Sequence, residues 1–250
     1  MKTLEFEEQR PIPDRDECLF YHTMTYSDGE KIPGVWEIPD FSDYIGDYNI
    51  TGKTILDIGT ATGYLTFSAE KAGAAEVTGF DMLDSKEQRL IPYTDSPHHL
   101  PADFSNSPIS KSWWYGWHKN KSNARCIYAS MPDLYECDTM FDVVIAGAIV
   151  EHISDPVFYI GAWAKVAQEA VIIPFTFFCN DDDMFMKPAS TWDHPQLSYT
   201  WWMLSAGLYR RIFDNLNFDV DFSKTTTAIW NREEGSLIVE RPTIIARRRR

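Results

Sequence analysis

The sequence has 250 residues and no apolar run that approaches the ~20 residues of a membrane span. Its first 17 residues are acidic and short of apolar side chains, which argues against a secretory signal. We therefore expect a cytoplasmic protein that contacts no membrane. Cysteine is also scarce, and the four cysteines lack the C-x-x-C spacing of zinc sites, so we expect reduced thiols and no metal. They are Cys18, Cys126, Cys137 and Cys179.

Basic residues are few as well. The chain has 23 Lys and Arg against 37 Asp and Glu, a net charge of −14. A field of this sign repels polyanions, which makes nucleic acid an unfavourable partner. The basic run at residues 247–250 is expected to end in a solvated tail, Arg248 to Arg250. The acidic run at residues 181–183 is expected to be a solvated loop, because consecutive aspartates cannot all converge on one metal ion.

The 44% of apolar residues are enough for one large core. From residue 53 onward, short β-type runs alternate with helical segments, which predicts an α/β domain with a parallel sheet covered on both faces. Residues 1–48 are expected to form an extension that covers the active site, and residues 49–250 the main domain, with an insertion at about 83–123 that includes a helix at 110–120. The expected strands are 54–58, 76–80, 124–128, 141–146, 170–175, 218–223 and 236–246, with further helices near 40–48 and 200–216.

The sharpest signal is ILDIGTATGYLTF at residues 55–67. A buried strand runs into Asp57, and a turn containing Gly59 and Gly63 then opens a helix. Glycines allow a tight turn and leave room for a ligand beside the backbone. The next strand, EVTGFD, ends at Asp81, where a carboxylate can accept both hydroxyls of a ribose. The turn lacks the third glycine of dinucleotide-binding folds, which disfavours a dinucleotide.

The D-x-G-x-x-x-G turn resembles motif I of class I S-adenosylmethionine-dependent methyltransferases. CIYASMPDL at residues 126–134 and FDVVIAGAIVEHISDP at residues 141–156 resemble later segments of the same class. The resemblance implies a Rossmann-like sheet of seven strands, mostly parallel with an antiparallel last strand, and helices on both faces. It also implies S-adenosylmethionine as cofactor and S-adenosylhomocysteine as product. The implied cofactor-binding residues are Asp57, Gly59, Thr60, Gly63, Asp81, Met82, Ser130, Met131, Gly147 and Ala148.

A closer resemblance covers about residues 20–247, including 20–40, 199–218 and 241–248. These segments are similar to the family that includes the tRNA wobble-uridine carboxymethyltransferase. The insertion and the acidic charge depart from the tRNA enzyme, so the resemblance implies a sister branch that acts on a small molecule. Three functions stay open: methyl transfer to an O, N or S atom of a small molecule, transfer of a carboxymethyl or other alkyl group to tRNA or a metabolite, and a non-catalytic partner role. A homo-oligomer stays open too.

Three residues are candidates for catalysis. His152 follows the fourth strand and is the first candidate for a general base; the alternative is a structural histidine that fixes the helix start. Glu151 either packs beside the adenosine or contacts solvent. His22 either reaches the pocket from the extension or is a hydrogen-bonded structural group. Aromatic side chains with polar tips suit a small acceptor. Those expected to bind substrate are Tyr21, Trp36, Trp113, Trp117, Tyr199 and Trp201.

Overall fold

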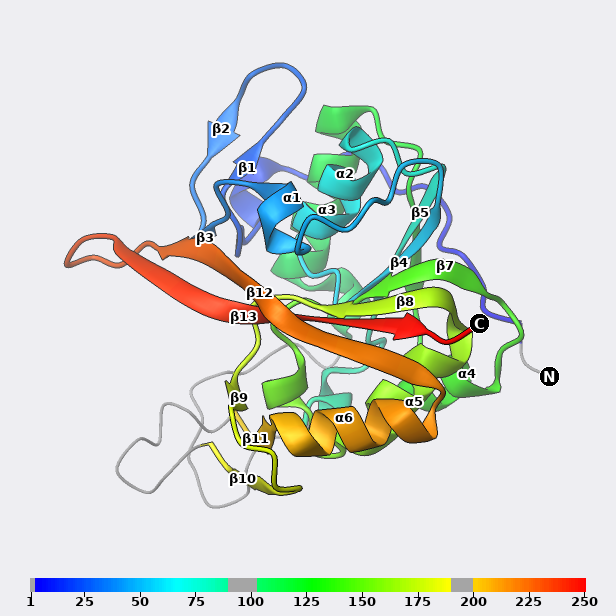
Figure 1. Cartoon of the computed structure of the whole chain (residues 1–250). Coiled ribbons are helices and arrows are strands. Elements are labelled where there is room, and N and C mark those ends of the chain that lie inside the picture. Colours follow the sequence, from blue (N-terminus) through cyan, green and yellow to red (C-terminus); the bar gives the residue numbers. More distant parts are fainter. Residues whose placement is uncertain (1–2, 90–102, 190–199) are drawn as a thin grey trace.

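The computed structural model describes residues 3–89, 103–189 and 200–250. One large mixed sheet crosses the molecule, and helices cover both of its faces (Figure 1). The strand order across this sheet is β3 (Trp36–Glu37), β12 (Phe218–Trp230), β13 (Leu237–Arg248), β8 (Ala167–Ile173), β7 (Phe141–Ile145), β4 (Thr54–Ile58), β5 (Glu76–Asp81) and β6 (Arg125–Tyr128).

The α/β prediction is confirmed, with a difference in the number of strands. Strands β8, β7, β4, β5 and β6 pair in parallel, and β13 lies antiparallel to both β8 and β12, as expected of the last strand. The sheet has eight strands where seven were expected, because β3 pairs with β12 through Trp36 and Trp230. A two-residue strand is too short to produce a periodic signal in the sequence.

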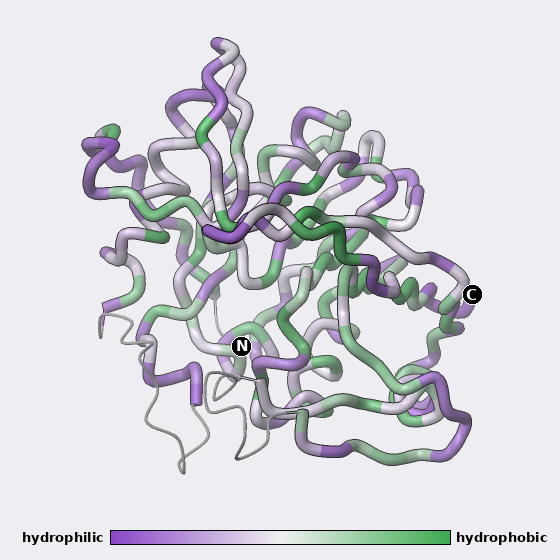
Figure 2. The backbone as a smooth tube through the Cα atoms, turned by 90° about the vertical axis from the view of Figure 1, so that its left-hand side faces the viewer, coloured by the Kyte–Doolittle hydropathy of each residue, from purple (hydrophilic) through white to green (hydrophobic). Residues whose placement is uncertain are grey.

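Each face of the sheet carries its own apolar core. Helices α1 (Phe41–Tyr44), α2 (Tyr64–Lys71) and α3 (Pro108–Asn120) lie on one face, and α4 (Met131–Glu136), α5 (Pro156–Val166) and α6 (Ala206–Asn215) on the other (Figure 1). Figure 2 shows apolar stretches running through the interior and hydrophilic ones towards the periphery. No helix within the described ranges combines the length and apolar character that a membrane crossing requires.

Short elements fill the remaining connections. A two-stranded sheet pairs β1 with β2, and a three-stranded sheet joins β10, β11 and β9 beside α6. The short strands are β1 (Met24–Thr25), β2 (Lys31–Ile32), β9 (Phe178–Cys179), β10 (Met186–Pro188) and β11 (Trp202–Ser205); the 3-10 turns are η1 (Arg15–Glu17), η2 (Ser85–Glu87), η3 (Phe104–Asn106) and η4 (Val150–His152).

Several boundaries differ from those expected. Helix α6 starts at Ala206 instead of residue 200, because the preceding residues form β11 and the Ser205 hydroxyl caps the helix by accepting the N–H of Leu208 at 3.1 Å. The two closing strands are longer than expected and form one long hairpin, β12–β13. Helix α3 begins at Pro108, two residues before the predicted helix, with Ser107 as its N-cap.

The N-terminal extension lies along both edges of the large sheet. At one edge the N–H of Glu7 donates to the carbonyl of Cys126 in β6, at 2.8 Å, and Leu4 is buried in the adjacent core. At the other edge β3 pairs with β12. Unpaired sheet edges favour association with other chains. The extension therefore protects the edges of the sheet as well as lying beside the turn described below.

The basic C-terminus is a solvated tail only in part, because Arg249 and Arg250 are exposed but Arg248 is partly buried. The Arg248 guanidinium donates to the carbonyls of Ala164 and Ala167 at the end of α5, at 2.6 and 2.8 Å. Arg249 donates to Asp214 of α6 at 2.8 Å. Cations at helix C-termini satisfy carbonyls that have no partner within the helix. These arginines therefore fasten β13 to two helices.

Candidate functional site

The turn after β4 forms the centre of the site. After Ile58, the last residue of β4, the chain passes through Gly59 and Gly63 into α2. Both glycines have left-handed backbone conformations, with φ of 68° and 84°. A Cβ on Gly63 would lie 2.4 Å from the ring of Phe67. Conformation and space therefore both require glycine at residue 63.

Asp57 stands at the end of a buried polar chain behind the turn. Its Oδ2 accepts a hydrogen bond from Thr66 Oγ1 at 2.7 Å, and Thr66 lies 2.8 Å from Thr60 Oγ1, which accepts the indole N–H of Trp113 at 3.1 Å. The other carboxylate oxygen, Oδ1, is buried without a hydrogen-bond partner among the described residues. Burial raises the pKa of Asp57 to about 6, and hydrogen bonds from Thr66 and Thr60 oppose the rise.

Asp81, the last residue of β5, connects that strand to the turn. Its Oδ2 accepts the N–H of Ala61 and its Oδ1 accepts the N–H of Met82, both at 2.9 Å. Burial raises the pKa of Asp81 to about 7. A carboxylate has about four acceptor positions, so it retains capacity for hydroxyl donors while it holds the turn. The acid and the glycine turn, paired in the sequence analysis, are thus in direct contact.

A cavity of about 110 Å³ opens beside the turn. Five of the predicted residues line it: Gly59, Asp81, Met82, Met131 and His152. Its volume is below the ~300 Å³ at which pockets for drug-sized ligands begin, so it would hold only part of a nucleoside ligand. The rest of the wall consists of Ile58, Phe80, Glu87, Gln88, Ala129, Ile149, Ile153, Ser154 and Tyr159.

Ser130 and Met131 are neighbours in the sequence but serve different purposes. The Ser130 hydroxyl accepts the N–H of Asp133, and the Asp133 carboxylate accepts the N–H of Ser130, both at 3.3 Å. This capping box starts α4 and occupies the Ser130 side chain. Met131 is buried and faces the cavity.

The segment after β7 packs against the turn. Ala148 has a left-handed conformation, with φ of 46°, and its N–H donates to the carbonyl of Pro174 at 2.9 Å. The side chain of Ile149 lies over Gly59, since a Cβ there would come within 2.6 Å of Ile149 Cδ1. A Cβ on Gly147 would lie 3.5 Å from the hydroxyl of Tyr44. The structure thus places Gly147 and Ala148 next to the turn, outside the cavity lining.

Glu151 and His152 have different surroundings. His152 lines the cavity together with Asp81. Glu151 is 1% exposed; its Oε1 lies 3.7 Å from a guanidinium nitrogen of Arg241, and its Oε2 accepts the Thr176 hydroxyl at 3.4 Å. The carbonyl of Glu151 also accepts the N–H of Trp201 at 2.6 Å. The structure therefore places Glu151 in the protein interior and His152 in the wall of the cavity.

His22 brings the N-terminal extension to the glycine turn. Its Nδ1 lies 3.5 Å from the hydroxyl of Thr62, and its ring packs against Tyr21 and Tyr64 with centroids 4.9 and 5.3 Å away. The ring is partly exposed, but its surroundings desolvate the cationic form and lower the pKa of His22 to about 4. His22 is therefore a neutral imidazole at pH 7.

The predicted substrate-binding tryptophans of α3 face the interior. Trp113 is completely buried against the turn, which leaves no open ring face for a substrate. Trp117 is partly buried, and its indole N–H donates to the carbonyl of Ala124 at 2.9 Å. These side chains support the turn and the neighbouring strand.

The other predicted aromatic residues lie elsewhere. Trp36 stacks on Trp230, with centroids 5.8 Å apart and an interplanar angle of 16°. Tyr21 is 40% exposed beside His22. The indole of Trp201 donates to the carbonyl of Arg89 at 2.5 Å. Tyr199 lies outside the described residues.

Two side chains near the site were not singled out from the sequence. Tyr44 of α1 is buried, its ring stacks on Phe175, and its hydroxyl points towards Gly147. Arg241 of β13 pairs with Glu151. Tyr44 belongs to no motif, and Arg241 begins the segment 241–248, whose resemblance gave this residue no role. Both side chains reach the site through strand order and helix packing. Among the described residues, no group of three His, Cys, Asp or Glu side chains is placed to hold a metal ion.

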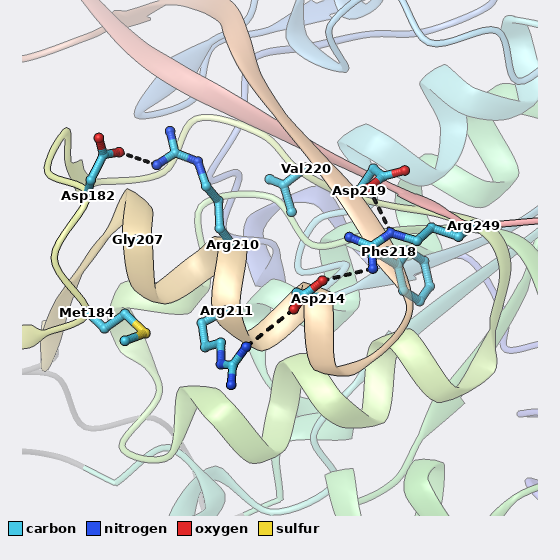
Figure 3. A pocket seen from close by; sticks show the side chains of 10 residues that line it. All are labelled: Asp182, Met184, Gly207, Arg210, Arg211, Asp214, Phe218, Asp219, Val220 and Arg249. Atoms are coloured by element: carbon cyan, nitrogen blue, oxygen red, sulfur yellow. Dashed lines mark hydrogen bonds and ion pairs between the residues drawn. The ribbon is translucent and has the colours of Figure 1, made fainter.

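A larger groove, of about 490 Å³, lies on another part of the surface between α6 and β12 (Figure 3). Its arginines are engaged in ion pairs: Arg210 with Asp182, and both Arg211 and Arg249 with Asp214. None of the predicted site residues lines it, so we assign it no role in the chemistry. Its walls are Asp182, Met184, Gly207, Arg210, Arg211, Asp214, Phe218, Asp219, Val220 and Arg249.

The comparison with protein families agrees with this geometry. A family model described as a methyltransferase domain matches residues 35–221, which include β4, the turn, Asp81 and the segment after β7. The chain belongs to the methyltransferase-domain family. It is an enzyme of this class, and its cofactor is S-adenosylmethionine. No curated protein matches the sequence.

Solved structures share the methyltransferase fold at low sequence identity. The N-terminal domain of EvdMO1, studied in the presence of S-adenosylhomocysteine and D-fucose, has a TM-score of 0.57 and 12% identity, over 94% of each chain. The YcgJ protein of Bacillus subtilis has a TM-score of 0.54 and 11% identity, over 84% of this methyltransferase and 98% of YcgJ. A putative methyltransferase of Bacillus halodurans has a TM-score of 0.53 and 10% identity, over 84% of this chain and 99% of that protein.

Proposed function

We propose that this methyltransferase transfers the methyl group of S-adenosylmethionine to an O, N or S atom of a small-molecule acceptor. The observation that carries the proposal is the hydrogen bond from the N–H of Ala61 to the Asp81 carboxylate, which joins the acid of β5 to the glycine turn at one cavity. When bound, the cofactor supplies an electrophilic methyl group on a positively charged sulfur.

The residues around the cavity fit the parts of this cofactor. The Asp81 carboxylate would accept the ribose hydroxyls, and Met82 and Met131 would pack against the adenine. Gly59 would let the methionine part approach the backbone, because it has no Cβ. The backbone at Gly147 and Ala148 would border the reacting methyl group. Four predicted residues would act indirectly. The turn would be held by Asp57, Thr60 and Gly63, and α4 would be started by Ser130.

Positioning is the main task of the remaining residues. In-line displacement is accelerated when nucleophile and electrophile are held at near-attack distance, an effect worth up to ~7–11 kcal/mol. Tyr21, His22 and Trp36 would place the acceptor from the N-terminal extension. Where the acceptor must lose a proton, we assign the base to His152, which faces the cavity, because the lowered pKa of His22, about 4, makes that histidine a weak base.

A small acceptor is favoured over tRNA by charge. The net charge of −14 opposes a phosphate backbone, and near the C-terminus Arg248 and Arg249 are engaged with helix carbonyls and an aspartate. This argument separates the protein from the wobble-uridine enzyme, which its sequence resembles.

Calorimetric titration with S-adenosylmethionine tests the site. We expect binding by the wild type and at least a ~tenfold loss in Asp81→Asn, which keeps the shape but loses an acceptor. The matched control is Glu76→Gln, at the exposed start of the same strand. Equal affinity of Asp81→Asn and wild type would overturn the assignment of the site.

The acceptor is then sought with methyl-labelled cofactor and a host metabolite extract. A labelled product heavier by one CH₂ supports methyl transfer. A larger increment would point to carboxymethyl or another alkyl transfer, and absence of cofactor binding at millimolar concentration would point to a non-catalytic partner.

A further inference from the structure

We propose that Arg241 is a positioning residue for methyl transfer, which acts through its largely buried ion pair with Glu151. The pair would fix residues 147–152 against β13, so that the backbone beside the methyl group and the wall of the cofactor cavity keep one geometry. This inference rests on the proposed function, and nothing in the sequence motifs assigns a role to Arg241.

The location of Arg241 follows from strand order. The pairing of β13 with β8 ends at Ile244 and Ile173, and the N–H of Thr176 then donates to the carbonyl of Pro242 at 3.1 Å. Arg241 therefore lies just past the carboxyl end of β8. The segment that follows β7 leaves the sheet at the same edge, which is where ligands bind in open α/β sheets.

Aromatic rings from two segments hold the Arg241 guanidinium. Its central carbon lies 3.7 Å from the ring centroid of Phe177, 4.5 Å from that of Phe175 and 5.7 Å from that of Trp36. The side chain is 18% exposed. A planar guanidinium stacked in this way has a fixed orientation that the flexible ammonium group of lysine does not reproduce.

Glu151 connects the oriented guanidinium of Arg241 to the residues that line the cavity. Its carboxylate contacts Arg241 and Thr176, and its carbonyl accepts the N–H of Trp201. Its neighbour His152 and, two residues earlier, Ile149 line the cofactor cavity. A shift of Glu151 would therefore shift both wall residues.

Stability alone does not explain why this pair is ionic. Replacing both partners of a buried ion pair by neutral residues is often neutral or stabilising, whereas removing one partner leaves an uncompensated buried charge. A pair that served only to hold the fold could thus be replaced by neutral residues without loss. We infer that the ionic pair is kept for the alignment that it imposes.

The test compares Arg241→Met, Arg241→Lys and the double variant Glu151→Gln/Arg241→Met with the wild type. For each we would measure the Tm, the Kd for S-adenosylmethionine, and kcat and KM with the acceptor found above. The control is Arg247→Met, on the same strand, whose ion pair with Asp221 has a similar length of 3.6 Å but is exposed.

We expect Arg241→Met to lower both Tm and kcat, and the double variant to regain the Tm while kcat stays about 10- to 100-fold below wild type, since misplacement by ~1 Å can cost ~100-fold. Arg241→Lys should have a kcat between those of the wild type and Arg241→Met. Arg247→Met should leave both Tm and kcat unchanged. If kcat recovers together with the Tm in the double variant, the pair is only structural and the proposal fails. Failure of the proposed function is seen separately, as absence of methyl transfer by the wild type.

Discussion

The indole N–H of Trp113 donates a hydrogen bond to the hydroxyl of Thr60, at 3.1 Å, and so connects helix α3 to the turn that follows β4. Thr60 lies in hydrogen-bond contact with Thr66, which donates to Asp57. The inserted region between β5 and β6 therefore supports the cofactor turn from inside the protein.

We predict that Trp113→Phe lowers the free energy of unfolding by ~2 kcal/mol, because it removes a buried hydrogen bond and leaves a cavity. Cofactor affinity should fall as the turn loosens, while KM for the acceptor stays unchanged. Urea denaturation and calorimetry measure the first two effects. Trp117→Phe is the control, since that indole bonds to a carbonyl away from the turn. A raised KM for the acceptor with normal stability would instead show that Trp113 binds the substrate.

Two glycine substitutions should have opposite effects. Gly63→Ala places a methyl group 2.4 Å from the Phe67 ring at a φ of 84°, so we expect a loss of ~2 kcal/mol or more and weaker cofactor binding. Gly161→Ala lies inside α5, where the new methyl group meets no atom within 4 Å apart from the helix's own backbone, and should gain ~0.5–1 kcal/mol from helix propensity. Thermal denaturation of both variants checks the signs; a stabilised Gly63→Ala would contradict the turn geometry.

Stability of the apoprotein should depend on two buried carboxyl groups. Burial raises the pKa of Asp57 from 3.8 to about 6 and that of Asp81 to about 7. Between pH ~4 and 7 the folded state therefore binds protons that the unfolded state has lost, and the free energy of unfolding falls as the pH rises through this window. The free energy of unfolding is measured against pH for the wild type and for the double variant Asp57→Asn/Asp81→Asn. The difference between the two curves isolates the contribution of these carboxyl groups. A difference that rises with pH would show that the carboxyl groups are already ionised in the folded protein.

Cofactor affinity should show the reverse dependence on pH. Only the ionised Asp81 carboxylate can accept both ribose hydroxyls, so protonation below its pKa of about 7 removes the binding form. We expect the Kd to rise roughly tenfold between pH 8 and pH 6. Calorimetry over this pH range provides the test. The control is Asp81→Asn, whose weaker affinity should not change with pH. A constant wild-type Kd would mean that Asp81 does not control binding through its charge.

The central features of the fold were accessible from the sequence because they follow from local patterns. Strand β4 was predicted at its observed bounds, since a strand buried on both faces reads as a short apolar run. The contact between Asp81 and the turn could be anticipated, because the carboxyl ends of neighbouring parallel strands meet at one edge of the sheet.

Other features depend on tertiary packing and left no local signal. The two residues of β3 form a strand only because Trp230 offers a partner nearly two hundred residues later. Trp113 looked like a substrate-binding residue because an aromatic-rich helix does not show which face is buried. Arg241 reaches Glu151 because β13 inserts between β8 and β12, an order that the sequence does not state.

The insertion of β13 between β8 and β12 also has a consequence for synthesis on the ribosome. The outer edge of β8 has no strand partner until residues 237–248 have emerged, and β12 has nothing to connect it to the sheet before then. At roughly 5–20 residues per second, the nascent chain presents this open edge for several seconds. The interval between the emergence of β8 and that of β13 is therefore when the chain is most exposed to mispairing, and when a ribosome-associated chaperone would protect it most.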